Sequence, residues 1–376
     1  MVDETLVVVD RRLKAYDFGP NHPLAPIRVM LTYDNIESHS LLDAEHVTTA
    51  EMAEDFDEHL IRSVHTDEYI EAVKTAGAAD GHGMPGFGLA SLDVPVFEGM
   101  HQASVNVCAA TFAATRAVAR ADAMHGLNLA GGLHHAMPAR ASGFCVYNDI
   151  AVSISWLLSQ GIERIAYIDV DAHHGDGVEA IFWDDPRVMT ISIHESGKTL
   201  FPGTGHVSDI GGPNAKGFAV NIPLPAGVDD AAWLRAFEGV VPVLLDDFKP
   251  QIIFSQHGCD SHRDDPLTHM NLTIDGQRAS YRLIHEWAHT FAQGKWIAVG
   301  GGGYALFDVV PKIWTHLAAI ATHQEEKVSF TEDANVEYAR FDDGWDPNNE
   351  IDRCIMATRR AIFPHHGLIA DPSAAF

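Results

Sequence analysis

The chain has 376 residues, of which 46% are hydrophobic and 20% charged, a composition that favours a globular protein with a large core and excludes extensive disorder. Its formal net charge of -27 disfavours direct nucleic-acid or membrane partners and favours cationic substrates, although the acidity is equally compatible with a role in solubility alone. The four cysteines lie far apart and no segment has the length of a membrane span, so a reducing, cytoplasmic location is expected.

Short runs rich in β-branched residues alternate along the chain with longer segments of helical periodicity. Strands are predicted at residues 6–9, 128–130, 164–170, 188–193, 218–222, 251–255 and 296–299. The clearest helices are predicted at residues 100–124, 148–158, 229–248, 275–293 and 307–322. This alternation predicts an α/β domain with a mostly parallel central sheet and helices on both faces.

Four of the predicted strands are followed by glycine-rich loops that carry histidine, aspartate or tyrosine. These loops are GGLHHA at 131–136, DAHHGDG at 171–177, QHGCD at 256–260 and GGGGY at 300–304. In a parallel sheet, active sites form beyond the carboxyl ends of the strands. The sequence therefore predicts one functional site built from these four loops.

The segment from 169 to 173 suggests a metal site. Asp169, Asp171 and His173 alternate, so they would share one face if the strand continued. Buried carboxylates need a compensating cation or proton, although helix capping or mutual pairing would also explain these residues. Asp171 and His173, with Asp260 from another loop, would complete a three-ligand site for zinc, iron(II), cobalt or manganese.

Two further features suggest catalytic groups beside such a metal. The adjacent His134 and His135 fit a general acid/base pair, with Asp169 and Asp176 as the carboxylates that orient them. The four glycines before Tyr304 could form a phosphate-binding loop, but no Lys-Ser/Thr follows them. The competing interpretation is that they let the backbone approach the site and direct the Tyr304 hydroxyl at a developing oxyanion.

The order and spacing of these motifs resemble those of the histone deacetylases of the arginase/deacetylase fold. The resemblance includes GFCVYND, YIDVDAHHGDGVEAIF and FPGTG, and it is stronger still to the bacterial acetoin-utilization deacetylases, through HPLAPIR and DVPVFEGM. It covers roughly residues 20 to 310. It implies one divalent metal, zinc before iron(II) or cobalt, held by Asp171, His173 and Asp260.

The resemblance also implies roles for other residues. His135 would be the main general base, His134 would support it electrostatically, and Tyr304 would polarise the substrate carbonyl. Asp93 would hold backbone amides of a peptide, and Arg28 would line a channel for released acetate. The remaining substrate contacts would be Gly143, Phe144, Phe201, Leu267 and Gly302, with the two phenylalanines as tunnel walls. A structural K⁺ or Na⁺ would lie near Asp169, Asp171, His173 and Ser192.

Residues 1–323 are expected to form the catalytic domain, and residues 324–376 an acidic extension packed on it. The expected activity is removal of acetyl groups from protein lysine side chains, by metal-assisted amide hydrolysis that releases acetate. Family members that prefer polyamines would carry an acidic residue where this chain has Leu267, so acyl-lysine is favoured. An acetylpolyamine or other small-molecule amidohydrolase, and a non-enzymatic acyl-lysine binder, remain the alternatives. A homo-oligomer stays open.

Overall fold

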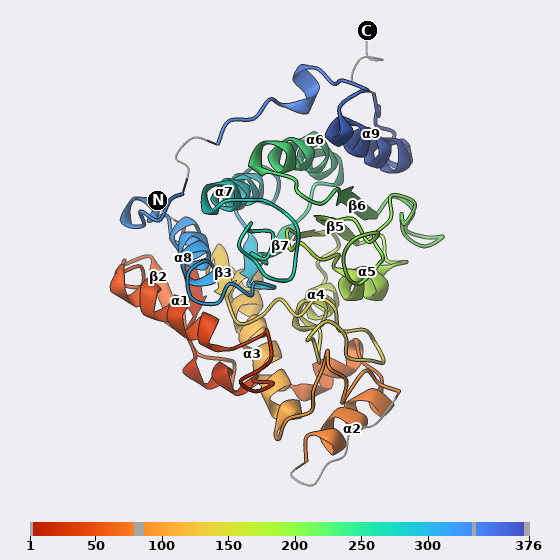
Figure 1. Ribbon diagram of the computed structural model, residues 1–376. Coiled ribbons are helices and arrows are strands. Elements are labelled where there is room, and N and C mark those ends of the chain that lie inside the picture. Colours follow the sequence, from red (N-terminus) through yellow and green to blue (C-terminus); the bar gives the residue numbers. More distant parts are fainter. Residues whose placement is uncertain (1–2, 79–85, 333–335, 372–376) are drawn as a thin grey trace.

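The computed structural model describes residues 3–78, 86–332 and 336–371. Within these residues the chain forms an eight-stranded sheet whose strand pairs are all parallel (Figure 1). In sheet order the strands are β2 (Val47–Ala50), β1 (Thr5–Val8), β3 (His125–Asn128), β8 (Trp296–Val299), β7 (Ile252–Gln256), β4 (Ile165–Asp169), β5 (Val188–Glu195) and β6 (Ala219–Leu224).

Helices cover both faces of this sheet (Figure 1). One face carries α1 (Ile27–Ser38), α8 (Val310–Ala321), α7 (Ile274–Phe291) and α6 (Asp230–Phe248), which pack side by side in that order. The other face carries α3 (Met100–Ala119), α4 (Asp149–Ser159) and α5 (Asp176–Phe182), and α2 (Asp67–Ala76) packs on α3. Short 3₁₀ segments lie at Arg11–Ala15, Glu58–Ser63, Glu325–Lys327, Phe341–Asp343 and Phe363–His366.

The sequence explains why these elements form where they do. Every residue of β4 and β7 is buried, as expected for strands covered on both faces, and this accounts for their continuous apolar runs. Several helices begin at a side-chain cap: Asn148 accepts from the amide of Ala151, and Thr273 from that of Gly276. The cap at Asn148 starts α4 within the GFCVYND segment.

The predicted fold class is confirmed, and its details need corrections. The strand expected at 128–130 is His125–Asn128, and the helix expected at 100–124 already ends at Ala119. The sequence analysis did not predict β2, α1, α2, α5 or the C-terminal helix α9 (Glu350–Ile362). Strand β2 and helix α5 are short, and α1 is only weakly amphipathic, so hydrophobic periodicity is a poor guide to them. Helices α2 and α9 are clearly amphipathic, so their periodicity was present in the sequence and was missed.

The segment after α8 returns to the far edge of the sheet. Helix α9 packs against α6 and against the edge strand β6. Arg235 in α6 forms an ion pair with Asp352 at 2.6 Å, and the Thr358 hydroxyl donates to the backbone oxygen of Asn221 in β6 at 2.8 Å. The C-terminal segment is therefore part of the same packed body as the sheet.

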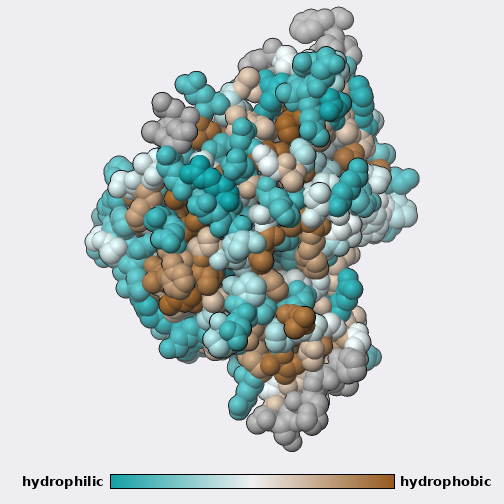
Figure 2. Space-filling view, in the orientation of Figure 1, coloured by the Kyte–Doolittle hydropathy of each residue, from teal (hydrophilic) through white to brown (hydrophobic). Residues whose placement is uncertain are grey.

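The surface in Figure 2 is mostly hydrophilic, with hydrophobic residues in separate patches. This agrees with the high acidic content of the chain, since its formal net charge is -27. Among the described residues, no helix is both long enough and apolar enough to cross a membrane.

Candidate active site

The four motif-bearing loops meet at one place because they follow four neighbouring strands. Strands β3, β8, β7 and β4 are adjacent in the sheet, and the loops at 131–136, 300–304, 256–260 and 171–177 leave their carboxyl ends. Chain segments more than 100 residues apart therefore converge, as when the amide of Gly302 donates to Oδ2 of Asp171 at 2.7 Å. The four loops therefore meet beyond the carboxyl ends of the strands, as predicted.

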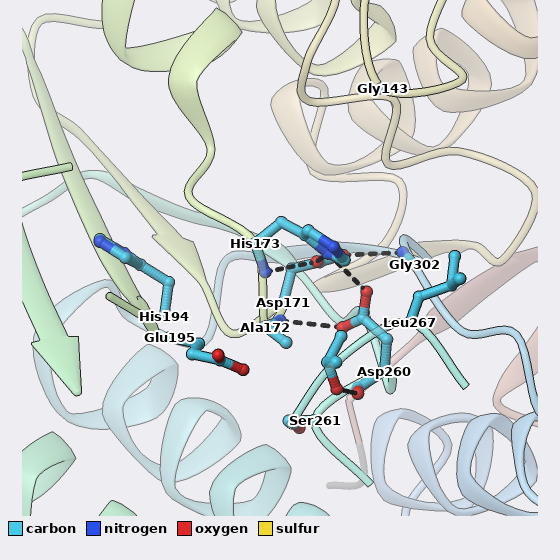
Figure 3. Close-up of polar contacts among 12 residues, drawn as sticks. Gly143, Asp171, Ala172, His173, His194, Glu195, Asp260, Ser261, Leu267 and Gly302 are labelled. Atoms are coloured by element: carbon cyan, nitrogen blue, oxygen red, sulfur yellow. Dashed lines mark hydrogen bonds and ion pairs between the residues drawn. The ribbon is translucent and has the colours of Figure 1, made fainter. Parts of the chain in front are cut away.

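Asp171, His173 and Asp260 point toward one another at this place (Figure 3). Nδ1 of His173 lies 3.0 Å from Oδ1 of Asp171 and 2.9 Å from Oδ2 of Asp260. Strand β4 ends at Asp169, so it does not continue through Asp171 and His173 as the shared-face argument required. These two residues reach the cluster from the loop that follows the strand. All three residues are buried, and one ligand atom from each lies within 4.8 Å of the others.

Glycines allow the backbone to approach these carboxylates closely. A Cβ at Gly258 would lie 2.0 Å from Oδ2 of Asp171, and one at Gly302 would lie 2.2 Å from Oδ2 of Asp260. Neither contact is sterically allowed, so both positions require glycine. This accounts for Gly258 of the QHGCD loop and Gly302 of the GGGGY loop without a phosphate ligand.

The electrostatics of the cluster fit a divalent cation. Burial and the Asp171 carboxylate raise the pKa of Asp260 to about 6. Burial by itself would lower the pKa of His173, but the two carboxylates beside it raise that pKa well above its ordinary value. In the absence of a metal, two buried carboxylates must be balanced by protons on these groups. A divalent cation supplies the same compensation, and two carboxylates with one imidazole match a catalytic ligand set.

His134 and His135 lie next to the cluster, and each is held by a carboxylate. Nδ1 of His134 is 2.7 Å from Oδ2 of Asp169, and Nδ1 of His135 is 2.6 Å from Oδ1 of Asp176. These are the two carboxylates that the sequence analysis assigned to this place. The Nε2 atoms of the two rings lie 3.1 Å apart, so both face the same space.

The environments of the two rings shift their pKa values in opposite directions. Burial opposes protonation of His134, but the carboxylates of Asp169 and Asp171 outweigh it and raise the pKa of His134 to about 9. Burial and the neighbouring charge of His134 lower the pKa of His135, despite the opposing effect of Asp176. His135 is therefore the neutral ring at neutral pH and can accept a proton, whereas His134 carries one.

Aromatic rings and a glycine surround the pair. The ring centroids of Tyr304 and Phe144 are 5.7 Å apart, and Phe201, which is 44% exposed, packs edge-on at 5.1 Å from His135. Gly143 has a φ of 53°, and a Cβ there would lie 2.2 Å from Cδ2 of His135. Tyr304, Phe144 and Gly143 line a narrow cavity, whereas Phe201, predicted as a second tunnel wall, does not line it. The cavity is lined by Leu24, Gly132, Leu133, His134, His135, Gly143, Phe144, Cys145, Gly301, Gly302 and Tyr304.

Asp93, Leu267 and Arg28, which were also predicted to serve the site, do not line this cavity. Oδ2 of Asp93 accepts a hydrogen bond from the amide of Gly143 at 2.7 Å. Leu267 is half-buried, and its amide donates to Oδ1 of Asp265 at 2.9 Å. Arg28 is buried in α1 and donates from Nη1 to the carbonyl of residue 303 at 2.9 Å. Its role in an acetate channel stays a prediction.

The residues of the predicted monovalent-cation site come from the end of β4, the loop after it and the interior of β5. Ser192 occupies the register position beside Asp169 in this strand pair. Its hydroxyl is 2.9 Å from Nδ1 of His194, and Asp169 also accepts from the Tyr167 hydroxyl at 2.6 Å. Binding of K⁺ or Na⁺ by Asp169, Asp171, His173 and Ser192 stays a prediction.

Three polar residues that the sequence analysis did not single out support the site. Gln256 donates from Nε2 to Oδ2 of Asp171 at 2.8 Å, and Oδ2 of Asp265 accepts from the amide of Tyr304 at 2.7 Å. Asp149 accepts from the amides of residues 132 and 133. Gln256 and Asp149 stand at the ends of QHGCD and GFCVYND, so the motifs pointed to them without indicating their partners.

His65 anchors the loop that carries the histidine pair. This buried ring contacts the carbonyl of Met137 through Nδ1 at 3.0 Å and accepts from the amide of Asn148 through Nε2 at 3.0 Å. Nε2 accepts from the Asn148 N–H, so a proton on Nε2 would face that N–H and is disfavoured. Burial lowers the pKa of His65 to about 4 from the ordinary 6.5. The unfolded chain therefore binds more protons than the folded chain between these two values, and stability falls as the pH falls through this window.

Because of His65, we expect the free energy of unfolding to be about 1 kcal/mol lower at pH 5.5 than at pH 7.5. Urea denaturation at both pH values measures this loss. His65→Leu should be less stable than the parent at pH 7.5 but should lose about 1 kcal/mol less on acidification. His59→Leu, at an exposed position, is the control and should keep the parental slope. Equal pH slopes in His65→Leu and the parent would contradict this assignment.

Comparisons with known proteins identify the family to which this chain is similar. The histone deacetylase domain family matches residues 22–321. The acetoin utilization protein AcuC of Bacillus subtilis (strain 168) is 42% identical over 316 residues, which cover 84% of this chain and 81% of that protein. AcuC of Staphylococcus aureus (strain MRSA252) is 37% identical over 322 residues, with 84% and 81% covered. The crystal structure of an HDAC homolog from Aquifex aeolicus superposes with a TM-score of 0.78 at 25% identity, over 94% of this chain and 99% of that chain.

Proposed function

Because the chain belongs to the histone deacetylase family, as its motifs also indicate, we propose that it removes acetyl groups from lysine side chains of proteins or peptides. A hydrolytic deacetylase is the activity that the family supports. The proposal adds the metal, the substrate class and the roles of individual residues. The observation that carries it is the convergence of Asp171, His173 and Asp260 with the oriented pair His134 and His135.

The metal ligands in this proposal are Asp171, His173 and Asp260, and zinc is the ion proposed first. When bound, the ion would act as a Lewis acid toward the acyl carbonyl and would favour deprotonation of the attacking water. Gln256 and the amide of Gly302, which both donate to Oδ2 of Asp171, hold that carboxylate in place. Iron(II) or cobalt would suit the same nitrogen and oxygen donors.

His135 is the proposed general base. It is neutral near pH 7 because burial and His134 lower its pKa, and Asp176 fixes its ring through Nδ1. Nε2 takes a proton from the attacking water as the carbon–oxygen bond forms, and the proton is then delivered to the departing nitrogen. The carbon–nitrogen bond breaks, and acetate and a free amine are released.

Tyr304 is the proposed donor to the oxyanion. Burial and the carboxylates of Asp260 and Asp171 raise the pKa of Tyr304 well above its ordinary value, so the phenol keeps its proton. Asp265 holds the backbone amide of Tyr304, and Phe144 packs against its ring. A donor positioned in advance stabilises charge that develops only in the transition state.

Two residues favour acyl-lysine over acetylpolyamines. Leu267 provides no charge for the second cation of a polyamine, whereas Asp93 offers a carboxylate to the backbone amides of a peptide. One oxygen of Asp93 already accepts from Gly143, which leaves Oδ1 for such a contact. Diffuse attraction from the net charge of -27 acts on both substrates and is screened beyond about 10 Å, so it cannot select between them.

We expect kcat/KM for acetyl-lysine peptides to exceed that for acetylspermidine and acetylputrescine by at least about tenfold, comparable to one hydrogen bond to a charged group. Parallel rate measurements on the three substrates, with metal content determined in the same sample, test this. Asp93→Ala should lose peptide activity. Asp93→Asn is the matched variant, because its amide oxygen can still accept from Gly143 while the negative charge is gone. Faster hydrolysis of the acetylpolyamines would refute the substrate class and leave the deacetylase chemistry intact.

A further inference from the structure

Four histidines form a second cluster of metal-ligating side chains. It lies at the amino-terminal end of β3, whereas the candidate active site lies beyond the carboxyl ends of the strands. One ring nitrogen from each of His125, His285, His289 and His323 lies within 4.8 Å of the others. His125 is the first residue of β3, whereas the loop with the catalytic histidines follows the last residue of the same strand. The cluster is therefore separate from the candidate active site.

The cluster joins three elements that lie together in Figure 1, β3, α7 and the end of α8. His285 and His289 are four residues apart in α7, so they share one face of the helix, and their Nε2 atoms are 3.1 Å apart. His323 follows the last turn of α8. The ring of His125 lies 4.9 Å from that of His285 and 5.1 Å from that of His323, measured between centroids.

Contacts outside the cluster orient two of the rings. Nδ1 of His125 lies 2.8 Å from the carbonyl oxygen of Ala321, which can only accept, so the hydrogen is on Nδ1 and the lone pair of Nε2 is free. Nδ1 of His289 lies 3.6 Å from a carboxylate oxygen of Asp3. A carbonyl or carboxylate on the second ring nitrogen is the usual support of a metal-bound histidine.

Two buried nitrogens of the cluster lack a partner within the described part of the chain. Nε2 of His125 and Nε2 of His323 are both shielded from solvent and have no hydrogen-bond partner there. Buried polar atoms are nearly always satisfied, so these two require an explanation. Burial lowers the pKa of His125 to about 4 and that of His285 to about 3, so both rings are neutral, the form that binds metals.

We propose that His125, His285, His289 and His323 bind a divalent transition-metal ion such as Zn²⁺. A tetrahedral site with zinc–nitrogen bonds of about 2.0–2.1 Å places ligand atoms roughly 3.4 Å apart, so the rings need only a small contraction. Neutral imidazoles suit zinc, copper and nickel. Four protein ligands leave no open position, so the ion would be structural and would fasten α7 and the segment after α8 to β3. The side chain of His289 is 35% exposed, which gives the ion a way in.

The test measures zinc per chain. The full-length protein is stripped with a chelator, equilibrated with Zn²⁺ and freed of unbound metal. The parent should retain two zinc ions, one at each site. His285→Ala/His289→Ala should retain one and keep its deacetylase activity, and Asp260→Ala should retain one and lose activity. The combined variant should retain none, so the two sites are scored independently.

His59→Ala/His365→Ala removes two exposed histidines elsewhere and should bind zinc like the parent. The proposal is overturned if the parent binds a single zinc that His285→Ala/His289→Ala retains, or if that variant binds as much zinc as the parent. Should the double variant not fold, His289→Gln replaces a single exposed ligand, and it should weaken one of the two sites by at least about tenfold. Parental affinity at both sites in His289→Gln would equally overturn the proposal.

Discussion

Asp260→Ala is expected to lose the metal of the active site and the deacetylase activity together. Oδ2 of Asp260 contacts His173 at 2.9 Å and Oδ1 accepts from the amide of Ala172 at 2.8 Å, so the residue also ties two loops together. Its removal leaves one carboxylate and one imidazole, too few ligands for a stable site. Lewis-acid stabilisation supplies several kcal/mol, so turnover should fall by about 10³-fold or more. Metal analysis and steady-state rates on an acetyl-lysine peptide measure the two losses.

Asp264→Ala is the matched control for this change. Asp264 lies in the same loop, but its side chain is 68% exposed and lies 4.0 Å from the nearest nitrogen of His262. This variant should keep the active-site metal and its activity. If Asp260→Ala kept the metal of this site and near-parental turnover, the ligand assignment would be wrong.

Tyr304→Phe is expected to lower kcat by about 10²–10³-fold while the bound metal and KM change little. The substitution removes one hydroxyl and keeps the ring that packs against Phe144, so the cavity wall remains. The loss falls on kcat because the hydroxyl donates most strongly to the oxyanion of the transition state. Steady-state kinetics on an acetyl-lysine peptide, with metal content measured in the same sample, separate this effect from loss of the ion.

Tyr338→Phe serves as the control, since this residue is packed at the edge of the main core in the C-terminal segment and contributes nothing to the cavity. It should turn over at the parental rate. Equal kcat for Tyr304→Phe and the parent would remove Tyr304 from the mechanism.

Much of the fold could be predicted because the buried strands are nearly continuous apolar runs. The strand expected at 251–255 is β7 (Ile252–Gln256), shifted by one residue, and the α/β class follows from the alternation of elements. Helix α1 was missed because Pro26 provides no side-chain cap at its start. Strand β2 was missed because its four residues are partly exposed and do not alternate.

The residue types of the site could be predicted from its motifs, but their pairings could not. The sequence indicates that Asp169 and Asp176 are available to orient histidines, yet only the order of the strands decides which carboxylate meets which ring. Gln256 and Asp265 act on groups in other loops, Asp171 and the amide of Tyr304, so their roles depend on the three-dimensional arrangement. Hydrophobic periodicity and motif spacing carry no information on such contacts.

Helix α9 also covers one of the two edge strands of the sheet. Edge strands carry unpaired backbone groups that can template pairing with another molecule. In this chain Thr358 occupies the Asn221 carbonyl of the edge strand β6, and the body of α9 lies against that strand. A shorter chain that stopped at residue 321, where the family match ends, would contain the whole candidate active site but leave β6 without this cover. The C-terminal helix thus shields the backbone of one of the two edge strands of the sheet.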